Sequence, residues 1–272
     1  MEGKTAAVQM RNITKRFGTV AANDKVWLDI YRGEILALLG ENGSGKTTLM
    51  NMLSGIYYPD EGQIFVDGKE VSIRSPKDAF DLGIGMIHQH FKLVDVLTAA
   101  ENIILGLPGK GRLDRNKVAE KIKSICDAYG FEVDPKKKIY DMSVSEKQTV
   151  EIVKVLYRGA DILILDEPTA VRTPQETDKL FAVLRNMRDD GKSVVIITHK
   201  LHEVEDLSDR VAILRRGQFV GDMLTKNTNA AEMTNMMVGR PVSLNIERPE
   251  PKDPQPRLAA KDLTARDEDG RL

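Results

Sequence analysis

Short apolar segments recur along this chain and predict its strands. They are four or five residues long, rich in Ile, Leu and Val, and lie at 35–39, 162–165, 194–198 and 211–214. Strands that are buried on both faces of a parallel sheet have this near-continuous apolar character. The pattern therefore predicts an α/β fold with a mainly parallel sheet at its centre.

Helices are expected between these strands. One should run from about 46 to 54, directly after the first apolar segment, and another, which crosses from one strand to the next, from 177 to 190. Between about 91 and 159 the strand-like segments disappear and apolar residues recur at helical spacing. These residues are Val118, Ile122, Ile125, Cys126 and Tyr129. The stretch is expected to form a helical insertion subdomain.

The N-terminal part of the chain predicts an antiparallel β subdomain. Apolar residues lie among polar ones in 8–13, and a second strand-like segment follows at 26–30. Residues 62–71 are typical of a hairpin, because Asp67-Gly68 stands between two strand-like halves and favours a two-residue turn. We expect these strands to form the antiparallel layer.

The composition of the chain argues against several classes of protein. The chain of 272 residues carries 40 Lys and Arg against 41 Asp and Glu, which gives no general bias toward nucleic acid or anionic lipid. Its longest apolar segments have about five residues, whereas a membrane-spanning helix needs about 20. A single cysteine excludes an intrachain disulfide, and the N-terminus has no signal-peptide pattern. We expect a soluble, cytoplasmic protein.

The C-terminal residues predict a linker and the start of a repeat. Five prolines in 241–257 are typical of an extended linker. Residues 258–264 then match 8–14 in their order of apolar, basic, Asn/Asp and Thr positions. We expect one domain over 1–240, the linker over 241–257 and, in 258–272, the truncated start of a second copy. A frayed C-terminal tail is the alternative.

A glycine-rich loop follows the first apolar segment. Residues 40–47 read Gly-Glu-Asn-Gly-Ser-Gly-Lys-Thr and fit the phosphate-binding pattern G-x-x-x-x-G-K-[ST] at every position. Gly43 and Gly45 let the backbone curl so that N–H groups point inward, and the helix N-terminus adds partial positive charge. Lys46 would reach the β- and γ-phosphates, and the Thr47 hydroxyl would bind Mg²⁺. A chance glycine-rich turn is the alternative, but the strand before the loop and the helix after it favour nucleotide binding.

Asp166 and Glu167 directly follow the apolar segment 162–165. A carboxylate at this strand end can hold Mg²⁺ through water, a role that we assign to Asp166. Glu167 would lie beside the γ-phosphate, where it would orient and deprotonate the attacking water. Acidic pairs are common at strand ends, so this prediction depends on the phosphate-binding loop lying on the same sheet.

The motifs occur in an order that resembles a known family. They are Phe17, the loop 40–47, Gln89, the segment 142–148, Asp166-Glu167 and His199. Over 5–240 the chain resembles the ATP-binding subunit of ATP-binding-cassette transporters, which implies a P-loop NTPase core. The stretches 83–91 and 97–102 resemble the importer branch for nucleosides, whose close relatives import monosaccharides. That branch usually fuses two cassettes in one chain, in agreement with the repeat expected from 258.

The resemblance implies a role for each motif. Phe17 corresponds to the aromatic residue that stacks on adenine, Gln89 to the glutamine that contacts Mg²⁺ or the attacking water, and His199 to the histidine that bonds the γ-phosphate. Catalysis is expected from Glu167, His199 and Gln89, and Mg²⁺ binding from Thr47, Gln89 and Asp166. The remaining nucleotide contacts are expected from Gly40, Glu41, Asn42, Gly43, Ser44, Gly45, Lys46, Thr47 and Thr48. No zinc site is expected, because there is one cysteine and no tight His/Asp cluster.

Residues 142–148 correspond to the family's signature, which acts on the ATP bound by a second cassette. Ser143 and Glu146 fit a capping box for a helix that begins there. Ser145 replaces a glycine that lets the backbone approach the phosphate, and its hydroxyl either crowds the phosphate or donates a hydrogen bond to it. The signature residues are Ser143, Val144, Ser145 and Gln148.

Two further departures from the family pattern lie in the segment after Glu167 and directly after Gln148. Arg172 puts a charge at the expected interface between cassettes, where Leu is usual, and Thr149 stands where Arg is common. In the family, cassettes dimerise head to tail and sandwich each ATP between one loop and the other signature. We therefore expect two unequal ATP sites, of which the site that uses Ser145 is the weaker.

The resemblance implies an ATP-hydrolysing subunit of an importer, with ATP and Mg²⁺ as cofactors, on the inner face of the cell membrane. Its expected partners are two transmembrane permease subunits, the second cassette and, indirectly, an extracytoplasmic solute-binding protein. The solute could be a nucleoside, a riboflavin-like compound or a sugar. One alternative is a cassette fragment with little or no turnover alone. Another is a soluble, non-transport cassette protein that acts on nucleic acid or ribosomes, which the balanced charge and short linker disfavour.

Overall fold

The computed structural model describes residues 5–89, 91–107, 114–170, 173–240 and the isolated positions 259, 261 and 264. The chain divides into two units, 1–242 and 243–272, and every described helix and strand lies in the first. The predicted linker and most of the predicted repeat lie outside the described residues, as do His90 and Arg172. None of the described helices is long and apolar enough to cross a membrane.

The central sheet has six strands in the order β10-β9-β3-β8-β7-β6. Their bounds are β3 (Ile35–Leu39), β6 (Ile84–Ile87), β7 (Ile162–Asp166), β8 (Ser193–Thr198), β9 (Arg210–Arg215) and β10 (Gln218–Leu224). All pairs are parallel except the edge pair of β9 with β10. Every residue of β3, β7 and β8 is buried, which explains their continuous apolar character. The predicted parallel sheet is confirmed.

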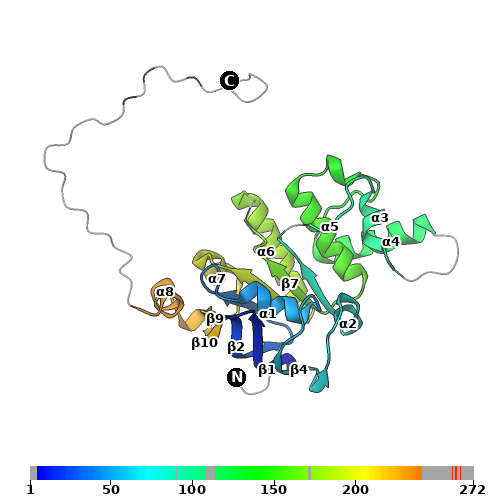
Figure 1. The fold of residues 1–272 in the computed structure, drawn as a ribbon. Helices are drawn as coiled ribbons and strands as arrows, with labels where there is room; N and C mark the ends of the chain where they lie inside the picture. Colours follow the sequence, from blue (N-terminus) through cyan, green and yellow to red (C-terminus); the bar gives the residue numbers. More distant parts are fainter. Residues whose placement is uncertain are drawn as a thin grey trace. The chain divides into compact units, whose positions relative to one another are not determined.

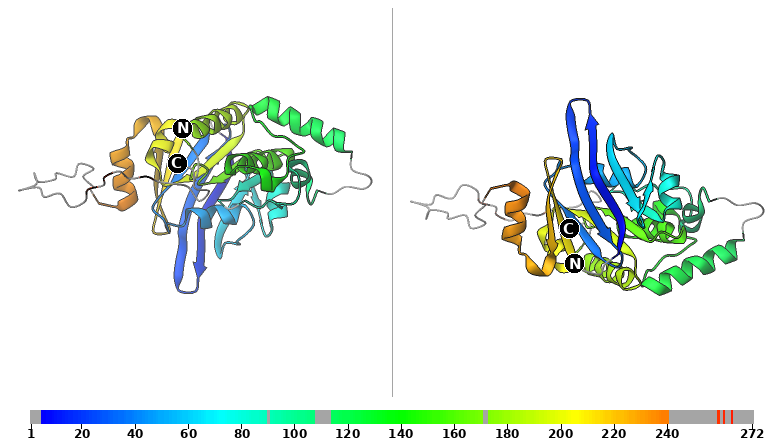
Figure 2. Two further views of the ribbon diagram at one scale, coloured as in Figure 1. Left: turned by 90° about the horizontal axis from the view of Figure 1, so that it is seen from above. Right: turned by 90° about the horizontal axis from the view of Figure 1, so that it is seen from below.

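A second sheet is antiparallel, with the strand order β2-β1-β4-β5. Its strands are β1 (Ala6–Phe17), β2 (Val20–Tyr31), β4 (Glu61–Val66) and β5 (Lys69–Val71). Asp67 and Gly68 both have positive φ, 50° and 75°, as the predicted hairpin turn requires. β1 and β2 are longer than expected and form the blue hairpin in Figure 2. Apolar side chains of both sheets share one core cluster, which also includes residues of α1 (Lys46–Leu53).

Further helices cover the other face of the central sheet, where they share a second core cluster with β3, β7 and β8. Among them are α6 (Pro174–Asp189), α7 (Leu201–Leu207) and α8 (Ala230–Val238), whereas α2 (Pro76–Asp81) packs with the first cluster. The crossover helix α6 begins three residues before the predicted start at 177. Thr173 and Glu176 form a capping box and Pro174 occupies the first turn, so the helix starts earlier than its apolar period indicates.

The helical insertion subdomain is present between β6 and β7, and Figure 1 shows its helices to one side of the strands. It consists of α3 (Ala99–Ile104), α4 (Arg115–Tyr129), the single turn η1 (Ile139–Asp141) and α5 (Val144–Tyr157). A third cluster forms its core, in which Val118, Ile122 and Cys126 of α4 are buried as their spacing predicts. One further single turn, η2 (Thr225–Asn227), precedes α8.

Candidate functional site: a phosphate-binding loop and a separate signature segment

The loop 40–47 lies between β3 and α1, as predicted. Gly43 and Gly45 have φ of 80° and 96°, a conformation that favours glycine. A Cβ on Gly45 would lie 2.2 Å from the Ala22 carbonyl oxygen, so a side chain there would collide with backbone. Gly45 therefore allows the loop to pass close to β2, where its backbone leads into the first turn of α1.

Lys46 is buried at the base of this loop. Its side chain donates to the carbonyl oxygens of Gly40 and Glu41, at 2.7 and 2.9 Å. Burial lowers the pKa of the Lys46 ammonium, while the nearby carboxylates Glu167 and Asp166 raise it. The buried hydroxyl of Ser44 has no hydrogen-bond partner in the described structure. A buried cation beside an unpaired hydroxyl fits a phosphate ligand, which supplies both negative charge and acceptor oxygens.

The side-chain oxygens of Thr47 and Asp166 lie close together at the first turn of α1. The Thr47 hydroxyl donates to the carboxylate of Asp166 at 3.3 Å. Burial raises the pKa of Asp166, the Thr47 hydrogen bond lowers it, and the charge of Glu167 raises it further. A hydroxyl and a carboxylate are the hard oxygen ligands that Mg²⁺ prefers, so the chemistry of this pair fits the predicted ion.

The Glu167 side chain contacts two other predicted catalytic residues, His199 and Gln89. Its carboxylate lies 2.9 Å from Nδ1 of His199 and accepts a hydrogen bond from the Gln89 amide at 3.4 Å. Gln89, Glu167 and His199 follow the neighbouring strands β6, β7 and β8, and the phosphate-binding loop follows β3 beside them. Because these strands are parallel, the three side chains and the loop meet at one edge of the sheet.

Phe17 lies at the end of β1 with a half-exposed ring, 45% accessible. Tyr57 contacts this ring edge to face, with centroids 5.2 Å apart and planes at 71°. The Lys15 ammonium lies 5.7 Å from the Phe17 ring centroid. No pattern in the sequence singles out Tyr57, because it comes from a loop 40 residues away that only folding brings to Phe17.

The other predicted nucleotide-binding residues differ in how exposed they are. Glu41, Asn42 and Gly43 are exposed, whereas Thr48 is partly buried in the first turn of α1. Gly40 leaves no room for a side chain, since its Cβ would lie 2.3 Å from the Leu214 carbonyl oxygen.

The signature segment forms the start of α5, and its predicted capping box is present. Ser143 accepts from the N–H of Glu146 at 3.2 Å, and Glu146 accepts from the N–H of Ser143 at 2.8 Å. Lys137 pairs with Glu146 at 2.6 Å. Both members of the capping box are thus paired within their own subdomain. Gln148 is buried and Val144 is exposed.

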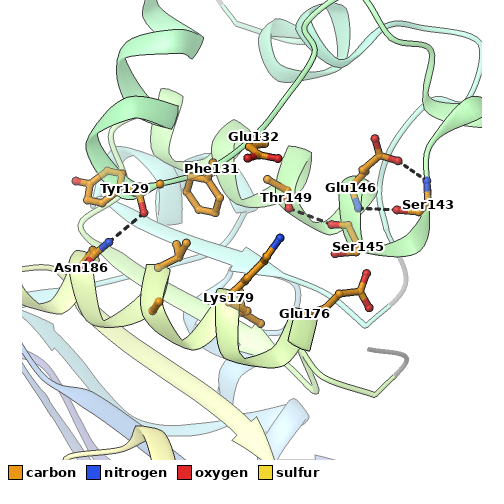
Figure 3. Close-up of a pocket in the computed structure, with 14 residues that line it drawn as sticks. Tyr129, Phe131, Glu132, Ser143, Ser145, Glu146, Thr149, Glu176, Lys179 and Asn186 are labelled. Carbon is orange, nitrogen blue, oxygen red and sulfur yellow. Dashed lines mark hydrogen bonds between the residues drawn. The ribbon is translucent and has the colours of Figure 1, made fainter. Parts of the chain in front are cut away.

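Ser143 and Ser145 line a pocket of about 460 Å³ between α5, the end of α4 and α6. Figure 3 shows Lys179 pointing from α6 into the space before α5, where the Thr149 hydroxyl donates to the Ser145 carbonyl at 3.0 Å. None of the described residues that line this pocket comes from the loop 40–47. The structure therefore brings the phosphate-binding loop and the catalytic candidates together, whereas the signature shares a hollow with Gln89 through Val144 and lines no described pocket with the loop 40–47.

Solved structures of the same class share this fold. An ATP-binding cassette of an ABC transporter in its ADP conformation superimposes with a TM-score of 0.76 at 24% identity, over 86% of this chain and 99% of that chain. A dimeric bacterial ABC transporter cassette gives 0.71 at 25% identity, over 80% and 98%. The fold is that of an ATP-binding cassette.

Sequence comparison identifies the family. The ABC transporter family matches residues 23–170, more than half of the chain. The nucleoside import ATP-binding protein NupA of Lactococcus lactis subsp. cremoris is 49% identical over 97% of this chain and 53% of its own length. The guanosine import ATP-binding protein NupO of Bacillus subtilis is 48% identical over 97% and 52%. The ribose import ATP-binding protein RbsA 2 of Escherichia coli O157:H7 is 44% identical over 90% and 49%.

The chain belongs to the ABC transporter family. The resemblance to its nucleoside and monosaccharide importer branch is confirmed by these relatives. The chain spans about half the length of the relatives it matches.

Proposed function

We propose that the chain binds and hydrolyses ATP as the energising subunit of an importer for a small solute. The proposal is carried by the convergence of Gln89, Glu167 and His199 beside a complete phosphate-binding loop. The names of the relatives support a nucleoside or a simple sugar as the solute, with a riboflavin-like compound as the remaining alternative.

At this site each side chain has a distinct task. Lys46 and the loop amides would hold the β- and γ-phosphates, with Phe17 stacked on the adenine. Thr47, Asp166 and Gln89 would hold Mg²⁺, which when bound offsets negative charge on the phosphates. Glu167 would take the proton of the attacking water, while His199 and Gln89 fix the geometry around its carboxylate and the γ-phosphate.

The signature would serve the ATP of a second cassette. Its helix start is exposed, and none of the described residues that line the pocket beside it comes from the loop 40–47, which supports a head-to-tail pair in which each ATP lies between two cassettes. The proposed organisation is a cassette over 1–240, a linker over 241–257 and the beginning of a second cassette over 258–272. Relatives of about twice this length are compatible with that organisation.

A hollow of about 360 Å³ beside Gln89 is the proposed docking surface for two transmembrane permease subunits. Phe91, Leu93 and Val144 give it apolar walls, and Asp95 and Lys147 a charged rim. Val96, 66% accessible, and Tyr140, 60% accessible, extend the apolar surface nearby. Docking there would place the chain on the inner face of the membrane, where it would respond only indirectly to an extracytoplasmic solute-binding protein.

ATP turnover measured against chain concentration tests this function. We expect saturable binding of one Mg-ATP per chain and a turnover per chain that rises with concentration as chains pair head to tail. Absence of nucleotide binding would contradict the function. Turnover per chain that stays constant from dilute monomer upward would contradict the need for a second cassette.

A further inference from the structure

A buried carboxylate lies behind the catalytic candidates and belongs to none of the sequence motifs. Glu203 of α7 is 2% exposed. It accepts hydrogen bonds from the hydroxyl of Thr169 and, at 2.8 Å, from the hydroxyl of Thr198. The Lys200 ammonium lies 3.0 Å from the same carboxylate. Both oxygens are thereby paired, as a buried charge requires.

The two threonines come from segments that follow neighbouring strands. Thr169 lies two residues after Glu167, beyond β7, and Thr198 ends β8 directly before His199. Lys200 strengthens the connection, because its ammonium donates to the Thr169 carbonyl at 3.2 Å and its N–H to the Thr198 hydroxyl at 3.1 Å. Glu203 therefore joins the two segments that carry the catalytic candidates.

Glu167 has a backbone conformation that needs such support. Its φ is 46°, in the left-handed region that a non-glycine residue keeps only where its surroundings fix it. One restraint is the hydrogen bond from its N–H to the Ile197 carbonyl of β8, at 2.9 Å. The Glu203 contacts provide a second connection between the same two segments.

We propose that Glu203 is a positioning residue that holds the Glu167 carboxylate at hydrogen-bond distance from His199. The proposal deepens the proposed function and rests on it for what these two side chains do at the γ-phosphate. Glu203 acts through the Thr169 and Thr198 hydroxyls and has no contact of its own with the nucleotide. Its loss should affect ligands with a γ-phosphate and spare those without one.

Glu34 provides a matched control. It is equally buried, at 2%, and pairs with the buried Arg210 at 2.6 Å. It directly precedes β3, whereas the phosphate-binding loop follows β3, so it lies at the opposite edge of the sheet. Thr225 provides a second control, as a buried threonine whose hydroxyl bonds Ser208 at 2.8 Å, in η2.

The experiment compares Glu203→Gln and Thr169→Val with Glu34→Gln and Thr225→Val in the whole chain. Affinities for ADP and for a non-hydrolysable ATP analogue are measured by calorimetry. We expect the first pair to bind the analogue about fivefold more weakly with ADP affinity unchanged, as for one lost hydrogen bond. The controls should leave the ratio of the two affinities unchanged. Equal losses for both nucleotides, or a changed ratio in the controls, would overturn the proposal.

A crystal structure of Thr169→Val separates this proposal from the proposed function. This variant removes one hydroxyl and keeps the volume of the side chain, so it should fold even where Glu203→Gln does not. We expect the Glu167 carboxylate to leave Nδ1 of His199. Retention of the 2.9 Å contact would overturn the positioning role, whatever the nucleotide affinities are. A wild-type chain that binds neither nucleotide would instead overturn the proposed function.

Discussion

The phosphate-binding edge of the central sheet and the start of α5 in the helical subdomain differ in how their polar groups are paired. At the sheet edge, Lys46 and Asp166 are buried, and the Ser44 hydroxyl has no partner in the described structure. At the start of α5, Ser143 and Glu146 form hydrogen bonds with each other, and Lys137 forms an ion pair with Glu146. The first region keeps a buried hydroxyl without a partner in the described structure, whereas both members of the capping box in the second region are paired.

This difference is compatible with the proposal that one chain builds only part of each ATP site. A buried cation and an unpaired buried hydroxyl are costly unless a ligand compensates for them, which supports the proposal that the sheet edge of this chain holds a nucleotide. The exposed capping box at the start of α5, whose two members are already paired, does not require a ligand to compensate for a buried charge. Its exposure agrees with the head-to-tail pairing proposed above, in which it would contact the nucleotide of another cassette.

Glu167→Gln should have the largest effect on the first region. The amide keeps the shape of the side chain but cannot take a proton, and general-base catalysis contributes about 10²–10⁴-fold. We expect at least a 100-fold loss of turnover with ATP binding retained, measured by single-turnover hydrolysis in the two-cassette protein. Glu132→Gln, an exposed carboxylate beside the signature, should leave turnover unchanged. Near-normal turnover in Glu167→Gln would mean that another group acts as the general base.

Lys46→Ala should weaken ATP binding by about tenfold or more, because charge-assisted hydrogen bonds to a phosphate are lost. A fluorescent ATP analogue measures the affinity. Lys179→Ala is the matched control, since it removes an exposed cation from the pocket beside α5 and should leave the affinity unchanged. Equal affinities for the folded Lys46→Ala and wild-type chains would refute the phosphate-binding assignment.

Tyr57→Leu should have a smaller effect that depends on the base. Tyr57 fixes the Phe17 ring by an edge contact, and such aromatic pairs contribute about 1 kcal/mol. We expect ATP binding to weaken by about fivefold at most, and the binding of inorganic triphosphate, which has no base, to stay unchanged. Tyr58→Leu, the exposed neighbour that contacts Arg74 instead, should change neither. A loss for inorganic triphosphate would show that Tyr57 acts on the loop rather than on Phe17.

The sequence predicts most of the sheet edge because its signals are local. The strands β3, β7 and β8 are continuous apolar segments, and the loop 40–47 has a fixed spacing, so both could be found without knowledge of distant contacts. The capping box at Ser143 was found for the same reason, because its two partners lie three residues apart. The start of α6 was misplaced because apolar periodicity does not include the polar capping residue Thr173.

The connections within the site could not be predicted, since they join residues far apart in the chain. Thr169 and Glu203 are 34 residues apart, and Phe17 and Tyr57 are 40 apart. Single Glu, Thr and Tyr residues are common on exposed surfaces, so nothing in their types or spacing indicates these contacts. Only the strand order, which places β7 beside β8 and β4 beside β1, brings them together.

The substitution Ser145→Arg tests most directly whether the signature and the phosphate-binding loop of one chain act on different nucleotides. It places a long, charged side chain at the start of α5 and leaves the capping box of Ser143 and Glu146 in place. The measurement compares the ATP affinity of this variant with that of the wild-type chain, at a concentration where both are monomeric. Equal melting temperatures of the two chains serve as the control for folding. Because the signature lies away from the chain's own phosphate-binding loop, we predict equal affinities. A clear loss of ATP affinity in the monomer would contradict the assignment of the signature to the nucleotide of a second cassette.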